Sequence, residues 1–176
     1  MLRQLIMNWI DRVKLVVIGA RQPGCPFFER LGSSIIIRVG GRYTAWLSMF
    51  IIYSKYFKGW ADVVVENRHS YPLLTPLYVR EPLVVVEHGL LGFNYFKCVQ
   101  PHLAILGFIF EKLMGLLGYR RAHFVAVSSL CAMDLYKVGI PASNVCIVYP
   151  GVEIAQKPPG KKSPIPIVTF IGVMDD

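Results

Sequence analysis

The chain alternates between short, uniformly apolar runs and longer segments in which apolar and polar residues are mixed. Two valine-rich runs, at residues 62–66 and 83–87, stand out in the middle of the sequence. Runs this short and this rich in β-branched residues predict strands, and their uniform apolarity is typical of strands covered on both faces of a parallel sheet. The pattern therefore predicts an α/β fold organised around these two strands.

The remaining segments extend this alternation along the chain. Further strands are predicted at residues 13–18, 34–39, 123–127 and 145–149. Helices are predicted at residues 4–12, 43–56, 101–117 and 129–138, with a short helical or turn segment at 71–78. Residues 19–31 and 89–100 are expected to be loops. This order predicts a Rossmann-like parallel sheet flanked by helices.

Polar residues stand where the two central strands end, and ligands of open parallel sheets bind beyond that edge. The first strand ends in Glu66, Asn67, Arg68 and His69, which are candidates for substrate binding. The second strand is followed by His88 and Gly89, and His88 is the candidate for chemistry. A histidine here can also bond a loop carbonyl, and polar residues after a strand also form solvated turns, so the residues alone leave both interpretations open.

Two residues on predicted helices have favoured structural roles. Ser128 precedes the helix at 129–138, where it is expected to cap the first turn; the backbone N–H groups exposed there could also bind an anion. Glu111 lies inside the apolar segment 101–117, and packing or capping is favoured over chemistry for it.

The composition raises the question of a membrane, because 54% of the 176 residues are hydrophobic, 17% are charged and the mean hydropathy is +0.46. A spanning helix needs about 20 apolar residues. The stretch 44–57 is shorter, and the stretch 103–117 is interrupted by Glu111 and Lys112. No spanning helix and no secretory signal are expected, which predicts a cytoplasmic location, with peripheral contact at the inner membrane surface left open.

The net charge of +8 is compatible with nucleic acid, an anionic membrane surface or a phosphorylated substrate. No motif of a nucleic-acid-binding fold is present, so nucleic acid is not expected as a partner. A basic chain with apolar helical faces is compatible with lipid headgroups. The four widely spaced cysteines, Cys25, Cys98, Cys131 and Cys146, predict buried, reduced thiols, and neither they nor the histidines have the spacing of a metal site.

The order of these features resembles the family 4 (group 1) glycosyltransferases, over nearly all of residues 13–172. The segments that carry the resemblance are RVGGRY at 38–43, WADVVVE at 60–66, PLLTPLY at 72–78, EH at 87–88, FVAVSS at 124–129, VYPGVE at 148–153 and FIG at 170–172. Each segment is short, and their order and spacing make the match specific.

The resemblance implies the two-domain GT-B fold and transfer of a sugar from a nucleotide-sugar donor to a sugar, lipid or other acceptor. It implies retention of anomeric configuration, without a metal or other cofactor. It places a histidine that faces the donor sugar at His88. It also implies that Gly151 lies at the interdomain hinge and Gly172 on the donor side.

The same comparison predicts an acceptor-side domain at residues 1–154, a proline-rich linker at 155–164 and the first strand of a donor-binding domain at 165–176. Residues 4–12 match only the end of the family's first helix. The central first strand is therefore expected to be missing, and its two neighbours to lack a partner. We expect the chain to be truncated at both ends and inactive alone. The alternatives are a degenerate binding module, one half of a split enzyme with a partner chain, and a membrane-surface protein.

Overall fold

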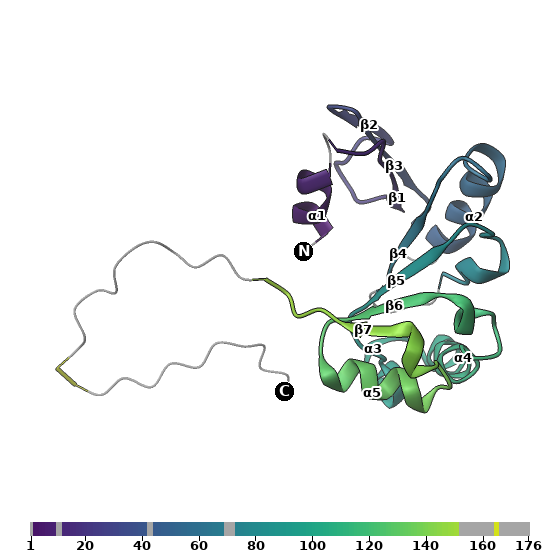
Figure 1. Ribbon diagram of the computed structural model, residues 1–176, viewed down its shortest axis with the longest axis vertical. Helices are drawn as coiled ribbons and strands as arrows, with labels where there is room; N and C mark the ends of the chain where they lie inside the picture. The colour runs from purple at the N-terminus through teal and green to yellow at the C-terminus, as the bar shows by residue number, and fades with distance from the viewer. Residues whose placement is uncertain (1, 10–11, 42–43, 69–72, 152–163, 166–176) are drawn as a thin grey trace.

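The computed structural model describes residues 2–9, 12–41, 44–68, 73–151 and 164–165 (Figure 1). His69 and Gly172 lie outside the described residues, as do nearly all of the predicted linker and of the strand expected after it. The described chain forms two sheets, each with helices packed on it (Figure 1).

The larger sheet has four parallel strands in the order β4-β5-β6-β7. Its strands are β4 (Val64–Arg68), β5 (Leu83–Glu87), β6 (His123–Ala126) and β7 (Val145–Ile147). Three helices cover one of its faces: α3 (Tyr95–Cys98), α4 (Pro101–Lys112) and α5 (Ser129–Lys137) (Figure 1). The predicted strand at 83–87 is confirmed at both ends, whereas β4 begins and ends two residues later than predicted.

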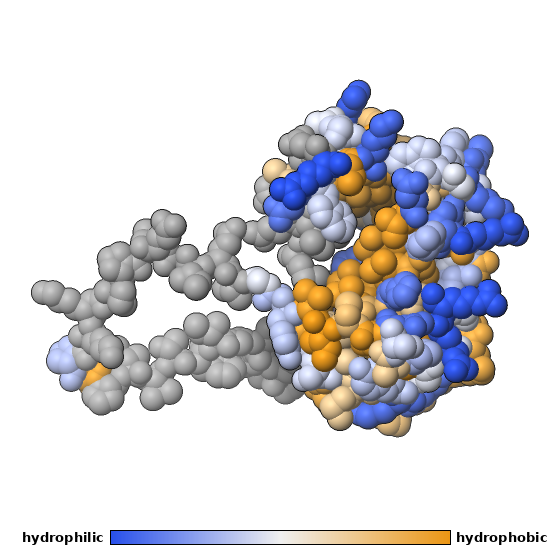
Figure 2. Space-filling view, in the orientation of Figure 1, coloured by the Kyte–Doolittle hydropathy of each residue, from blue (hydrophilic) through white to orange (hydrophobic). Residues whose placement is uncertain are grey.

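The core lies between this sheet and its helices. Val85 and Phe124 on the strands and Leu135 on α5 are fully buried there, and burying each such side chain stabilises the fold by about 1.5–3 kcal/mol. The expected burial on both faces holds for β5 but not for β4, where Val65 is 40% exposed. Figure 2 shows apolar side chains gathered on the surface over β4 to β7.

The smaller sheet contains a strand that the sequence pattern missed. Strands β1 (Val16–Ala20) and β3 (Ser34–Val39) are parallel, but β2 (Phe28–Leu31), within the predicted loop 19–31, pairs antiparallel with β3. Residues 28–31 alternate between exposed and half-buried, a pattern of antiparallel strands with one open face rather than of an apolar run. Gly32, at φ 57°, turns the chain between β2 and β3. Helix α2 (Ala45–Tyr56), predicted at 43–56, packs on β1 and β3.

The two sheets are separated between β1 and β4. Among the described strands, β1 pairs only with β3 and β4 only with β5. The resemblance places a central strand at this position, between the two strand edges that the described strands leave unpaired. Helix α1 (Leu2–Trp9) precedes β1. It begins two residues before the predicted helical segment, which starts at residue 4.

The connecting segments are more structured than predicted. The expected loop 89–100 contains the short helices η2 (Gly92–Asn94) and α3, and the turn segment contains η1 (Thr75–Leu77). Helix α4 starts at its proline as predicted but ends at Lys112, and the chain continues through η3 (Tyr119–Arg121) into β6. A further short helix, η4 (Ala142–Asn144), precedes β7.

The composition led to two expectations, buried thiols and no membrane-spanning helix, which the described residues test. The three cysteines whose side chains are described are free, but only Cys131 is buried, while Cys25 is half-buried and Cys146 is exposed. Among these three, the prediction of buried thiols holds for Cys131 alone, and the side chain of Cys98 lies outside the described residues. None of the helices in the described ranges has the length and apolarity needed to cross a membrane.

Candidate functional site

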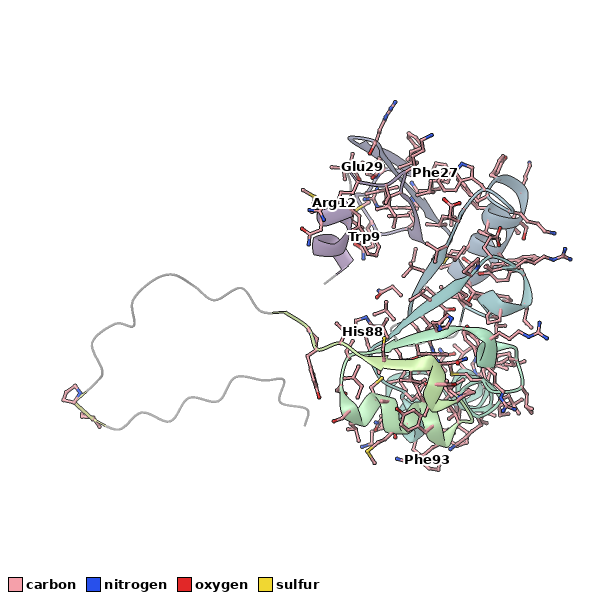
Figure 3. All side chains as sticks on the ribbon, viewed as in Figure 1. Trp9, Arg12, Phe27, Glu29, His88 and Phe93 are labelled. Atoms are coloured by element: carbon pink, nitrogen blue, oxygen red, sulfur yellow. The ribbon has the colours of Figure 1, made fainter. Side chains whose placement is uncertain are left out.

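The carboxyl ends of β4 and β5 bring Asn67 and His88 together. The strands run in parallel register, with Asn67 beside Val86 and Arg68 beside Glu87. His88 follows β5 directly, and its Nε2 lies 3.0 Å from Oδ1 of Asn67. In the tautomer that carries its hydrogen on Nε2, His88 donates to this amide oxygen, which only accepts hydrogen bonds. Figure 3 shows His88 at the end of the sheet from which the chain leaves β7.

Gly89 shapes the turn that follows His88. Its φ of 138° lies in the region that side chains rarely adopt, so only glycine holds this turn without strain. Its N–H donates to Oε1 of Glu87 at 3.1 Å. The turn is therefore bonded to Glu87, the last residue of the strand. The backbone of His88 lies between Glu87 and Gly89, which this hydrogen bond joins.

An ion network lies beneath this edge. Nη1 of Arg68 is 3.0 Å from Oε2 of Glu87, and Nη2 is 3.4 Å from Oε1 of Glu111. All three residues are buried, and Arg68 also contacts Sδ of Met114. The contact with Glu87 is an ion pair that lacks hydrogen-bond geometry. The network joins β4, β5 and α4 through one guanidinium group.

Glu111 extends this network to the loop that follows His88. Its two carboxylate oxygens accept the backbone N–H groups of Leu91, at 3.0 Å, and of Gly92, at 2.8 Å. A buried carboxylate on α4 therefore anchors the loop that carries His88. The sequence signal was a glutamate inside an apolar helix, but its partners lie about twenty residues away, so their identity could not be predicted.

Glu66 is held by a separate set of donors. It accepts hydrogen bonds from the hydroxyl of Thr75, from the hydroxyl of Tyr119 at 3.1 Å and from the backbone N–H of Leu73 at 3.4 Å. Burial raises the pKa of Glu66 above its ordinary value, although these donors and Arg68 oppose the shift.

The charges of the buried groups do not balance. One guanidinium, that of Arg68, lies among the carboxyl groups of Glu66, Glu87 and Glu111. Burial raises the pKa of Glu87 as well, against the opposing effect of Arg68. Burial therefore makes ionisation of Glu66 and of Glu87 less favourable than in water, and Arg68 opposes this effect at both residues.

Ser128 caps α5 as predicted, because its Oγ accepts the N–H of Cys131 at 3.1 Å. The Cys131 thiol donates to the carbonyl oxygen of Glu87 at 3.3 Å, which ties α5 to the end of β5. Burial raises the pKa of this thiol to about 11.

Gly151 is exposed, with no atoms near the position of a Cβ.

The structure thus divides the predicted site residues into two groups. Asn67, His88 and Gly89 are half-buried and lie together at the edge of the sheet. Glu66 and Arg68 were expected at the carboxyl end of the strand, with Arg68 following it. Strand β4 instead includes both, and their side chains point into the interior.

The comparison with known families identifies the chain. The model of the family described as Glycosyltransferase Family 4 matches residues 1–156, which include both sheets and the edge that carries His88. The chain belongs to this family. No curated protein and no solved structure matches it. The family 4 assignment confirms the suspected resemblance, and the fold is the expected Rossmann-like α/β arrangement.

Proposed function

We propose that this chain forms the acceptor-side half of a glycosyltransferase that moves a sugar from a nucleotide-sugar donor to a sugar, lipid or other acceptor. One observation carries the proposal: His88 is oriented by Asn67 at the carboxyl end of a parallel sheet, where such folds bind ligands. Membership of a glycosyltransferase family supports sugar transfer as the reaction class.

In this proposal His88 faces the donor sugar, and Asn67 and Gly89 shape the neighbouring acceptor side. A retaining transfer of this kind depends on placing the acceptor hydroxyl and on stabilising the departing diphosphate, and it includes no metal or other cofactor. Arg68 and Glu66 act from beneath, by fixing the strand end that carries Asn67.

The other predicted residues have supporting places in the proposal. Ser128, already engaged as a helix cap, lies at the rim of the acceptor site, and Gly151 serves as the hinge toward the donor side. His69 and Gly172 are assigned to the acceptor and donor sides from the resemblance alone. We place the protein in the cytoplasm, and the free thiols of Cys25, Cys131 and Cys146 support a reducing compartment.

The binding step is tested by NMR of the histidine rings while a panel of nucleotide sugars and free glycans is titrated into the full chain. The four histidines give few signals, and His88→Gln identifies the signal of interest. We expect a shift at His88 and none at His102, which is exposed on α4. Shifts of equal size at both rings would contradict a site at the sheet edge.

The catalytic role of His88 is tested by sugar transfer from radiolabelled donors to extracts of acceptors, with a donor-domain chain added where one is found. His88→Ala should lower turnover by about 10²–10³-fold, the size of effect seen when one stabilising donor is removed. His102→Gln serves as the matched control and should leave turnover unchanged. Normal turnover in His88→Ala would remove it from the mechanism, and binding without any transfer would favour the binding module.

A further inference from the structure

In the described part of the chain, the fully exposed charged side chains are almost all positive. Among the described residues, twelve basic side chains are exposed, whereas Asp62 is the single exposed acidic one. Glu66, Glu87 and Glu111 are buried beneath the site. The fold therefore removes negative charge from the surface and leaves a strongly basic exterior.

The partly exposed acidic side chains are also engaged. Glu29 pairs with Arg38 at 2.6 Å, and Asp134 pairs with Lys137 at 2.8 Å. Glu81 accepts the hydroxyl of Tyr53 on α2. The two ion pairs offset the negative charges of Glu29 and Asp134, whereas Glu81 keeps its charge beside the hydroxyl of Tyr53.

Helix α2 presents an apolar stripe to solvent. Trp46, Leu47, Phe50 and Ile51 lie on one side of the helix at the spacing of successive turns, and they are 46%, 43%, 38% and 50% exposed. A helix that is apolar on all sides is ordinarily buried on all sides. Exposed apolar surface of this kind marks an interaction site.

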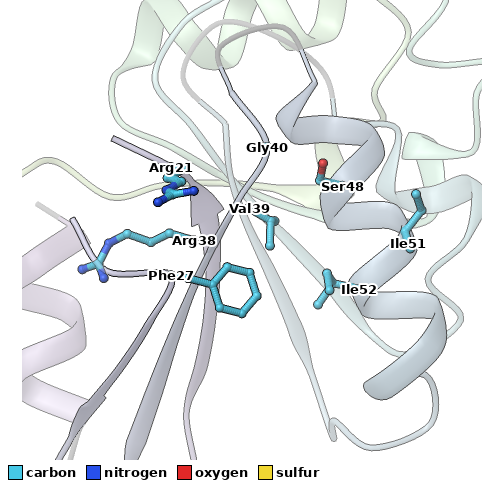
Figure 4. A pocket seen from close by; sticks show the side chains of 8 residues that line it. All are labelled: Arg21, Phe27, Arg38, Val39, Gly40, Ser48, Ile51 and Ile52. Atoms are coloured by element: carbon cyan, nitrogen blue, oxygen red, sulfur yellow. The ribbon is translucent and has the colours of Figure 1, made fainter. Parts of the chain in front are cut away.

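The stripe continues onto its neighbours on both sides. Trp46, Leu47 and Phe50 share a depression of about 220 Å³ with Leu77 of η1, which is 61% exposed. On the other side, Ile51 lines a depression of about 370 Å³ between α2 and β3. Figure 4 shows that second depression, with Arg21, Phe27 and Arg38 across from α2. The apolar surface therefore extends from Phe27 across α2 to Leu77.

Basic residues border this surface. Lys55 follows Ile51 by one helical turn, and Lys58 follows the end of α2. Arg80 is held near the same end, because its neighbour Glu81 accepts both the Tyr53 hydroxyl and the N–H of Gly59. All three basic side chains are exposed.

We propose that the outer face of α2, together with η1, docks on a membrane surface that contains anionic lipids. The apolar stripe would enter the boundary between headgroups and acyl chains, with Trp46 at headgroup depth, while the bordering lysines and arginines contact lipid phosphates. The inference goes beyond sugar transfer and does not depend on it, because docking requires neither donor nor acceptor.

The charges and the shape of the stripe favour a lipid surface over other occupants. An anionic lipid surface complements the positive charges of Lys55, Lys58 and Arg80, whereas a second copy on this face would add its own three basic side chains to the same interface. Nucleic acid binds apolar surfaces by stacking bases on aromatic rings. Leu47, Ile51 and Leu77 cannot stack, and they make up much of the exposed stripe.

The first experiment uses Trp46 as a reporter in the full chain. Trp9→Phe and Trp60→Phe leave it as the single tryptophan. With vesicles of phosphatidylcholine and phosphatidylglycerol, we expect a blue shift of its emission and quenching by brominated acyl chains. Vesicles of phosphatidylcholine alone should give a much weaker response. Unchanged emission with both kinds of vesicle would overturn the proposal.

The second experiment measures vesicle co-sedimentation of paired variants. Leu47→Gln with Ile51→Gln, and separately Lys55→Gln with Lys58→Gln, should each weaken binding to anionic vesicles by about tenfold or more. The matched controls are Leu130→Gln, exposed on α5, and Arg12→Gln with Lys14→Gln, which removes the same charge elsewhere. These controls should retain binding, and circular dichroism should show that all variants fold.

Two results would overturn the docking surface. One is equal weakening by the α2 variants and by their controls, which would mean attraction by overall charge alone. The other is a dimer in the absence of lipid that Leu47→Gln with Ile51→Gln abolishes while no vesicle binding is found, because a second copy would then occupy the face.

Discussion

Arg68 illustrates how one residue organises the site from below. It lies at the end of β4, where the sequence suggested a polar group facing a ligand. Its side chain instead turns inward and joins Glu87 on β5 to Glu111 on α4. Through Glu111 it also reaches the backbone of the loop that follows His88. The positions of Asn67 and His88 at the sheet edge therefore depend on buried charged residues that do not face that edge.

Removing that cation should be costly. Arg68→Met leaves two buried carboxyl groups without a counter-charge, and we expect the free energy of unfolding to fall by about 3–5 kcal/mol in urea titrations. Arg80→Met, an exposed control, should change it by less than about 0.5 kcal/mol. Adding Glu111→Gln should recover part of the loss, because one of the unpaired charges is then gone. Equal effects of Arg68→Met and Arg80→Met would refute the network.

At the scale of elements, the site depends on how closely α3 approaches α4. Tyr95 of α3 is fully buried, and its ring lies against Gly107 of α4. A Cβ at position 107 would lie 2.6 Å from Cε1 of Tyr95, closer than packed atoms allow. This contact sets the position of α3, which follows directly on the loop fastened to Glu111.

Gly107→Ala should therefore destabilise the protein even though alanine favours helices. Alanine gains about 0.5–1 kcal/mol in helix propensity. Overpacking against Tyr95 costs about 1–3 kcal/mol, so a net loss is expected in thermal or urea unfolding. Amide exchange at Gly92 should also quicken, because α3 must shift. Gly151→Ala, where no atom lies near the added methyl, is the control, and a stabilised Gly107→Ala variant would show that α3 can move freely.

At the scale of the whole molecule, the charges are segregated. Among the described residues, the carboxyl groups of Glu66, Glu87 and Glu111 are buried around one guanidinium, and most of the exposed charged side chains are basic. This segregation has two consequences. The exterior favours anionic surfaces, and the interior favours proton uptake, because the raised pKa values of Glu66 and Glu87 mean that the folded chain binds more protons than the unfolded chain.

Stability should consequently fall as the pH rises. The contribution of Glu66 and Glu87 is complete below their ordinary pKa of 4.5 and is lost as the pH passes through their raised values. We expect the Tm to decrease as the pH rises above 4.5, until both carboxyl groups are ionised in the folded chain. Glu66→Gln should flatten this slope, whereas Glu29→Gln, on the surface, should keep it. The hydrogen bonds of Glu81 lower its pKa to about 2, so its contribution to stability is lost only as the pH falls below 4.5. A Tm that rises over this range would contradict the assignment.

Local patterns were sufficient for part of the fold and failed where pairing or packing decides the structure. Strands β3 and β5 and helices α2 and α5 follow from apolar runs, periodicity and caps, all of which are properties of neighbouring residues. Strand β2 pairs with β3 along its length, and α3 is positioned by the packing of Tyr95 against Gly107. Neither partner can be identified from the residues of the element itself.

The same division holds for the site. The sequence by itself determined the family, the α/β fold and the edge at which Asn67 and His88 meet, because parallel strands end on the same side of a sheet. Only the tertiary structure decided that Glu66 and Arg68 point inward, that Glu111 holds the loop of His88 and that the α2 stripe faces solvent. The reason is physical: successive side chains of a strand face opposite sides, and which side is interior depends on what packs there.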